Sequence, residues 1–346
     1  MTEFPRRNAL SLLGAGMAFL AGCSESSTDG GNGNGPDTES GSPNDGIEID
    51  GESGALPSYA SYLPESERTG YFYGAIDAET LQTLTDDEGA TEGSEPTDPL
   101  IGNPVIMAIL FGRIGTVASF DAYKENDDTP GGDGVLIDAN GVYTIVGRYD
   151  RSGFTDDLES AGFTAETVND DYAVYADDES GEAVGITDEV FAVTTPNPNN
   201  DAFDPISAVK RTVATAVGDR KPKYETDDDF EWLLRASSTA GMTLCRYTET
   251  ETFDAGTIGS EQVNSSTLEF AFGACEGANG VHQQLSLVDG SMTATASAIV
   301  TYADESRVSM DRLKAALGTE ASSVAFNRDG STVAIDAEYD GDLVEE

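Results

Sequence analysis

The chain has 346 residues, and its 64 acidic side chains against 18 lysines and arginines give a formal net charge of −46. Charge this negative excludes a nucleic-acid-binding protein, because lysine and arginine hold a phosphate backbone and carboxylates repel it. A mean hydropathy of −0.32 excludes a protein with many membrane spans, whereas 38% hydrophobic residues are enough to build a folded core.

The N-terminal residues predict an export signal over 1–22. Two arginines precede an apolar run at 9–21, which is shorter than the roughly 20 residues that a membrane-spanning helix needs. The arginine pair resembles a twin-arginine signal, and the end of the run resembles a lipobox, which implies cleavage before Cys23 and lipid attachment to its thiol. A core helix that happens to end in cysteine is the alternative. The signal residues are Arg6, Arg7, Leu20, Ala21, Gly22 and Cys23.

Residues 23–55 predict a flexible acidic linker. They are almost all glycine, serine, asparagine, threonine, proline and acidic residues. Such a segment cannot bury enough apolar surface to offset the entropy lost on ordering. A lipid on Cys23 followed by this linker would hold the folded body just outside the membrane. The alternative is a secreted form released by proteolysis within the linker.

The charge density predicts a protein that works in brine. Like charges at this density destabilise a compact chain in dilute buffer, and in roughly 1 M salt the Debye length of about 3 Å screens their repulsion. Together with the export signal, the composition resembles the surface lipoproteins of extremely halophilic archaea. The resemblance implies a membrane-anchored location outside the cell, and it carries no activity with it.

The first predicted unit of the body covers 56–200. Alternation and turn residues predict strands at 70–77, 135–137, 141–149, 172–175, 182–186 and 190–194. Helices are predicted at 78–85, from Pro104 in a first turn to Phe111, and from a Thr155 cap to a stop at Gly162. Residues 100–119 contain no acid, which favours a core helix over a patch that faces lipid or a partner.

The second predicted unit covers 201–346. Helices are predicted after caps at Asp204 and Thr226 and at 308–317, and strands are predicted at 291–302, 322–326 and 332–339. The segments around Cys245 and Cys275 are also predicted strands. We therefore expect an α+β protein with mostly antiparallel sheets and packed helices. The similar order in the two units raises the hypothesis of duplicated strand-helix-strand-strand units.

Cys245 and Cys275 are expected to form a disulfide, because paired cysteines outside the cell are usually bonded. The bond would stabilise the fold by about 3 to 4 kcal/mol in the chain-entropy model. Two buried free thiols are the alternative. A catalytic cysteine is the weakest interpretation, because His282 is the chain's one histidine.

No catalytic motif is recognisable, so we expect a non-enzyme without a cofactor. One histidine and a cysteine pair cannot supply the three or four soft ligands that zinc needs. The acidic loop at 125–133 offers carboxylates, but its spacing matches no known calcium loop, and it is interpreted as a solvated loop. No metal site is therefore predicted.

One short stretch departs from the acidity of the chain. Its cations either complement the C-terminal dipole of a helix and neighbouring acids, or form a docking patch for an acidic surface protein or an anionic glycan. Asn264 begins an Asn-Ser-Ser glycosylation acceptor. The cations of the predicted patch are Lys210, Arg211, Arg220, Lys221 and Lys223.

These features predict a non-enzymatic cell-surface lipoprotein with a binding or structural role in the envelope. Its partners would be the membrane, through the lipid on Cys23, and a surface protein or glycan. The alternative function is a solute-binding receptor for a membrane transporter, which requires a deep cleft between two lobes. A hydrolase that uses carboxylates or bound cations ranks last.

Overall fold

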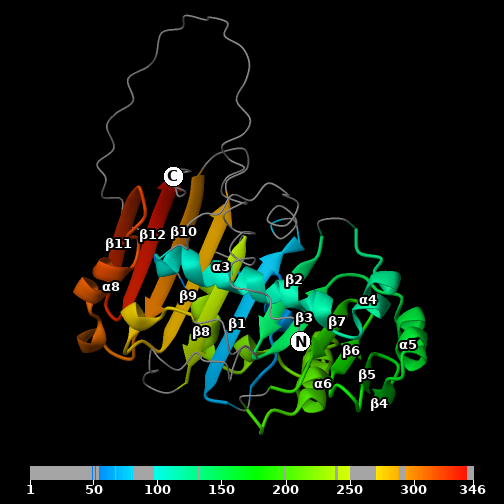
Figure 1. Ribbon diagram of the computed structural model, residues 1–346. Coiled ribbons are helices and arrows are strands. Elements are labelled where there is room, and N and C mark those ends of the chain that lie inside the picture. The colour runs from blue at the N-terminus through cyan, green and yellow to red at the C-terminus, as the bar shows by residue number, and fades with distance from the viewer. Residues whose placement is uncertain are drawn as a thin grey trace, which may run out of the picture.

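The computed structural model describes most of the predicted body and little of what precedes it. The described residues are 49, 51, 54–66, 68–78, 80, 97–130, 133–197, 200–237, 241–249, 270–287 and 293–340. Within them the protein is α+β, as predicted, and it is built on one antiparallel sheet with helices packed on both faces (Figure 1).

The sheet of the described residues has twelve strands in the order β11-β12-β10-β9-β8-β1-β2-β3-β7-β6-β5-β4. The strands of the first half are β1 (Gly70–Asp77), β2 (Val135–Ala139), β3 (Val142–Val146), β4 (Thr164–Val168), β5 (Ala173–Ala176), β6 (Ala183–Ile186) and β7 (Val190–Thr194). Those of the second half are β8 (Met242–Thr248), β9 (Gly280–Leu287), β10 (Thr293–Thr301), β11 (Ser323–Asp329) and β12 (Thr332–Asp340). The helices are α3 (Pro99–Phe111), α4 (Phe120–Asn126), α5 (Arg151–Ser160), α6 (Pro205–Ala216), α7 (Asp228–Arg235) and α8 (Met310–Ala316).

The two halves of the sheet share one connection pattern. In the first half, β1, β2 and β3 form a meander. After α5 the chain continues at the edge of the sheet with β4 and runs back through β5 and β6 to β7, which pairs with β3. In the second, β8, β9 and β10 form a meander, and after α8 the chain returns from the edge strand β11 to β12, which pairs with β10. The common order is what a duplication requires of the connectivity, although the second half has fewer returning strands.

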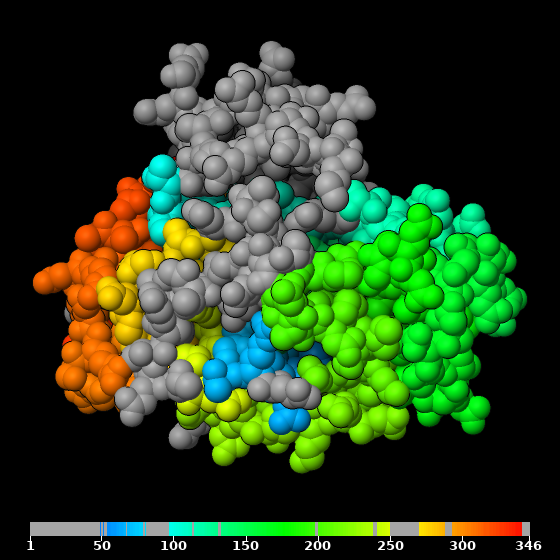
Figure 2. All heavy atoms as spheres, turned by 60° about the horizontal axis from the view of Figure 1, so that its bottom comes forward, coloured from blue at the N-terminus to red at the C-terminus, as the bar shows by residue number. Residues whose placement is uncertain are grey.

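The halves join through β1 and β8, which pair antiparallel, so the sheet continues across the predicted unit boundary at residue 200. Figure 2 shows the second half, in orange, and the first half, in green, at opposite ends of the body. The central pairing places Tyr73 opposite Ala139 on one side and opposite Cys245 on the other.

The faces of the sheet are covered by different helices. Phe72 and Ile76 of β1 pack in the core under α3, whereas Tyr71 and Tyr73 pack on the opposite face, where α7 lies. Helix α6 covers that second face over β5, β6 and β7. Alternate side chains of a strand point to opposite faces, so each central strand contributes to both cores.

Helix α3 crosses the middle strands of the sheet (Figure 1). A Cβ atom on Gly74 would lie 2.3 Å from Cγ of Met107, so only glycine in β1 allows this close approach. The buried carboxylate of Asp98 caps the helix by accepting a hydrogen bond from the amide of Leu100 at 3.1 Å. Asp98 also accepts from the hydroxyl of Tyr339 at 2.9 Å, which ties the start of α3 to β12.

Several predicted boundaries are wrong because nearby residues cap more effectively. Helix α3 starts at Pro99 after its Asp98 cap, so Pro104 lies inside the helix instead of in its first turn. Helix α5 is capped by Asp150, several residues before the predicted Thr155 cap. Helix α7 is capped by Asp227 instead of Thr226.

The predicted strand around Cys275 is also wrong, because Gly273–Cys275 form the 3₁₀ helix η5. Helix α4 and strands β4 and β9 were not predicted from the sequence. The predicted helix at 78–85 lies mostly outside the described residues.

Candidate docking site at the end of helix α6

Helix α6 forms where the sequence predicts it. Asp204 caps it through a hydrogen bond from the amide of Ser207 to Oδ1 at 3.2 Å, and Pro205 occupies its first position. Its apolar stripe packs on β6, where a Cβ atom on Gly185 would lie 2.6 Å from Cγ1 of both Val209 and Val213. This close packing fixes the helix on the sheet and leaves its other side exposed.

Four of the five predicted patch cations lie outside the core around α6, and together they are here called the α6 patch: Lys210, Arg211, Arg220 and Lys221. Lys210 is exposed, and its Nζ donates to Oγ1 of Thr167 in β4 at 3.2 Å. Arg220 and Lys221 are exposed in the segment after the helix, which Gly218 turns at a φ of +82°. No described acid forms an ion pair with Arg220 or Lys221.

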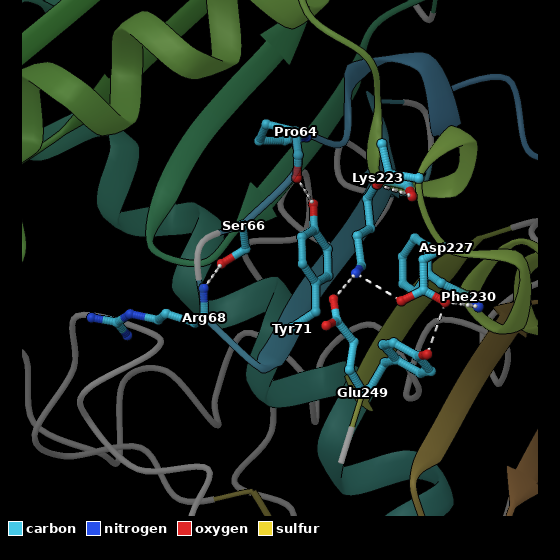
Figure 3. Close-up of polar contacts among 10 residues, drawn as sticks. Pro64, Ser66, Arg68, Tyr71, Lys223, Asp227, Phe230 and Glu249 are labelled. Atoms are coloured by element: carbon cyan, nitrogen blue, oxygen red, sulfur yellow. Dashed lines mark hydrogen bonds and ion pairs between the residues drawn. The ribbon is translucent and has the colours of Figure 1, made fainter.

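The fifth predicted cation, Lys223, is not part of a surface patch. It is 3% exposed, and its Nζ lies 2.8 Å from Oδ2 of Asp227 and 2.5 Å from Oε1 of Glu249 (Figure 3). The ammonium also lies 5.6 Å from the centre of the Tyr247 ring. The prediction failed because the chain folds back at Pro222 and carries this side chain inward, which a count of cations along the sequence cannot show.

Opposing effects set the protonation of this buried pair. Burial alone lowers the pKa of Lys223, but hydrogen bonds to Asp227 and Glu249 outweigh it and raise that pKa above the usual value. Burial alone raises the pKa of Asp227, but donation by Lys223, by the amide of Phe230 and by the hydroxyl of Tyr247 brings it below the usual value. Both groups therefore stay charged at neutral pH.

The Lys223 anchor holds the patch segment against the start of the folded body. The amide of Lys223 donates to the carbonyl of Leu63 at 2.9 Å, and Pro222 forms a β-bridge with Pro64. The carbonyl of Pro64 in turn accepts from the hydroxyl of Tyr71 at 2.8 Å (Figure 3). Arg220 and Lys221 thus lie on a short segment fixed at both ends, by α6 before it and by the anchor after it.

The predicted disulfide between Cys245 and Cys275 is not present, because both residues are buried free cysteines. Cys245 in β8 packs in the core on the α7 face. Cys275 in η5 packs in the core on the α3 face. The sheet lies between these two cores, so the sulfurs cannot bond without unfolding the structure.

Cys245 nevertheless has a neighbour that the sequence could not assign to it. The strand register places His282 of β9 directly opposite it, and Tyr73 of β1 on its other side. The hydroxyl of Tyr73 and Nε2 of His282 form a hydrogen bond of 2.8 Å. Thiol and imidazole thus share one buried row on the α7 face.

This row cannot activate a nucleophile in the folded state. Burial raises the pKa of the Cys245 thiol well above its usual value and lowers the pKa of His282 to about 3. Both side chains are therefore neutral at neutral pH, whereas a catalytic cysteine needs a thiolate. Exposures of 0% and 1% also keep a substrate away from them.

Other predicted sites are described in part or not at all. The export-signal residues, Cys23 and Asn264 lie outside the described residues, as does nearly all of the linker at 23–55. In the acidic loop, Asp127 accepts from the amide of Thr129 at 2.9 Å and from the hydroxyl of Tyr123 at 3.0 Å. Across the described part of the chain, no three His, Cys, Asp or Glu side chains are grouped so that they could hold a metal ion.

One described helical stretch, Pro99–Thr116, is long and apolar enough to cross a membrane by length and composition alone. In the folded protein 59% of it is buried, and α3 packs on β8, β9 and β1. This is the core helix that its freedom from acids favoured.

Comparison with known proteins identifies no family. No protein-family model matches the chain, and no curated protein does. Crystal form I of the protein TP0453 aligns at a TM-score of 0.39 and 11% identity, over 84% of this chain and 95% of that one. Crystal form III aligns at a TM-score of 0.40 and 10% identity, over 84% and 96%. These scores are too low to assign a shared fold or a function.

Proposed function

We propose that the protein is a non-enzymatic cell-surface lipoprotein of a halophile, and that the α6 patch docks an anionic glycan of the envelope. The observation that carries the docking role is that exposed Arg220 and Lys221 directly follow α6, without an ion pair to a described acid, in a chain with a net charge of −46. The anchor role rests on the signal residues and on Cys23, which resemble a twin-arginine signal and a lipobox.

The patch suits a ligand that carries carboxylate or sulfate groups. Arginine presents several N–H donors in a planar fork, which matches such groups in a bidentate geometry. In about 1 M salt long-range attraction is screened, so only contacts at hydrogen-bond range contribute. A fixed segment that carries adjacent Arg220 and Lys221 meets that condition at a smaller entropy cost than a flexible one.

The alternative receptor function fits the described fold less well. A solute-binding receptor of the expected kind closes a cleft between two lobes. Here β1 and β8 join the halves into one sheet, and α3 from the first half packs on β8 and β9 of the second. A hinge between the halves would have to break these contacts.

A binding measurement with charge-reversed variants tests the docking role. We expect Arg220→Glu with Lys221→Glu to bind a uronate-bearing or sulfated polysaccharide about tenfold more weakly than the wild type, in about 1 M salt, because each lost contact is worth up to about 1 kcal/mol. The control is Lys124→Glu with Lys314→Glu, which changes the charge equally at exposed sites away from α6. Equal binding of the polysaccharide by the two variants would refute the proposal that the patch binds a glycan. If the patch binds an acidic protein and no polysaccharide, its partner is an acidic protein instead.

The location is tested separately. Mass spectrometry of the mature protein should find Cys23 as a lipidated first residue, and recovery of unmodified Met1 from a cytosolic fraction would contradict the surface role. Far-UV circular dichroism should show unfolding on dialysis into low salt, because unscreened repulsion among the carboxylates then acts at full strength.

A further inference from the structure

The described sheet is open, and its two edge strands differ in how they are protected. In β4 the pairing with β5 shifts between Ala165 and Thr167, and Glu166 adds a charge at the shift. Bulges and charges of this kind prevent an edge from pairing with another chain. In β11 the pairing with β12 runs without a shift from Ser323 to Asp329. The β11 edge at the left of Figure 1 therefore lacks the bulge that protects β4.

Strand β11 carries no net charge although it lies at the edge of the described sheet. Its charged side chains are Arg328 and Asp329, which cancel, although the whole chain carries 64 acids. Val324 is 41% exposed. The guanidinium of Arg328 donates to the carbonyls of Gly330 and Glu305, each at 2.9 Å, so it is held on its own chain. The strand thus offers a neutral and partly apolar edge.

The topology shows what kind of neighbour this edge can accept. In the shared connection pattern β12 corresponds to β7 and β11 to β6, because each pair returns to the third strand of its meander. Strand β6 pairs antiparallel with β5 on its outer side. Strand β11 has no described strand in that place, so an antiparallel strand would complete the same arrangement.

We propose that β11 pairs antiparallel with β11 of a second copy of this chain, about a twofold axis at Ala325. This register places Val324 opposite the partner's Phe326, and a β-branched residue opposite an aromatic one stabilises a strand pair. It places Arg328 opposite the partner's Ser322, so no like charges meet. A strand that is neutral and matches itself in this way fits its own copy, and the contact is isologous.

Charge makes this contact dependent on salt. Each copy carries a net charge of −46, so two bodies repel strongly in dilute buffer. In about 1 M salt the Debye length of about 3 Å removes most of that repulsion, and the backbone hydrogen bonds of the edge remain. The pairing should therefore form in brine and dissociate as salt is diluted, before the fold itself is lost.

Exposed valines on the two edge strands give matched test variants. In sedimentation equilibrium of the full chain with Cys23→Ser, in about 1 M salt, we expect twice the monomer mass. Val324→Glu should weaken the association at least tenfold, because it puts an unpaired charge into the pairing. Val168→Glu on β4 adds the same charge at a residue 62% exposed and should leave the dimer intact. Far-UV circular dichroism checks that both variants are folded.

A cross-link tests the register independently of folding stability. Ala325→Cys in the Cys23→Ser chain should form a disulfide-linked dimer on mild oxidation, because residue 325 faces its own copy across the axis at a separation that a disulfide spans. Ala165→Cys, an exposed position on β4, should stay monomeric. A monomeric wild type in brine, loss of the dimer only in Val168→Glu, or equal cross-linking at both positions would each overturn the proposal.

Discussion

Replacing Lys223 by methionine directly tests the buried ion pairs of Lys223 with Asp227 and Glu249. The side chain is 4% exposed and joins Asp227 at 2.8 Å and Glu249 at 2.5 Å. Removing one partner of a buried ion pair costs about 3 to 5 kcal/mol. The Glu249 carboxylate is 50% exposed, so its share is at most about 1 kcal/mol.

The Asp227 carboxylate keeps two hydrogen-bond donors in this variant. It still accepts from the amide of Phe230 at 3.1 Å and from the hydroxyl of Tyr247 at 2.9 Å. The loss should therefore lie at the low end of the range, at about 3 kcal/mol in the free energy of unfolding. Lys221→Met is the matched control, because its side chain is exposed two residues away and should cost no more than about 0.5 kcal/mol.

Urea unfolding in about 1 M salt, followed by circular dichroism, measures both variants. The Asp227 contribution is present above the unfolded pKa of 3.8 and is lost as pH falls through the depressed folded value. The Lys223 contribution is present below 10.5 and is lost as pH rises through the raised folded value. The difference between wild type and Lys223→Met should thus hold across neutral pH. A cost below about 0.5 kcal/mol, or equal costs for both lysines, would refute the buried anchor.

Three further predictions follow from buried groups. Burial raises the pKa of Asp138 from 3.8 to about 7. Between pH 4 and pH 8 the free energy of unfolding of the wild type should therefore fall by roughly 4 kcal/mol relative to that of Asp138→Asn. A difference in urea unfolding that stays constant over this pH range would contradict this. Burial lowers the pKa of His282 from 6.5 to about 3. As pH falls from 6.5 to 4, the free energy of unfolding of the wild type should therefore fall by roughly 3 kcal/mol, whereas that of His282→Gln should not show this loss. Parallel pH profiles of the two proteins would show that the histidine is solvated. In a Cys23→Ser chain, a thiol reagent should label Cys245 and Cys275 only after the protein is unfolded without reductant. If the unfolded protein is not labelled either, the two cysteines form the disulfide that the sequence predicts.

Helices and strands with strong local sequence signals were predicted from the sequence. Strand 70–77 is β1 as predicted, and α6 follows its Asp204 cap and Pro205. Where competing caps lie close together, as before α5 and α7, the sequence placed the start wrongly, because which carboxylate caps depends on the path of the preceding chain. Strand β9 was missed, since its polar residues His282, Gln283 and Gln284 conceal a buried strand.

The candidate site was predicted only in part for the same reason. The charge excess and the cation cluster are properties of composition, so the sequence alone establishes them. Which cations reach solvent depends on a chain reversal that brings Pro222 beside Pro64, residues far apart in sequence. That contact separates buried Lys223 from exposed Lys221.

What the sequence determined by itself is the acidity, the α+β class and the elements whose caps and alternation are local. The tertiary structure decided that Cys245 and Cys275 lie in cores on opposite sides of one sheet, that Cys245 lies beside His282, and that β11 is left at an edge. Strand pairing joins residues far apart along the chain, and a shift of one residue exchanges the two faces of a strand. Partners across a sheet therefore follow from register, which no local pattern in this sequence encodes.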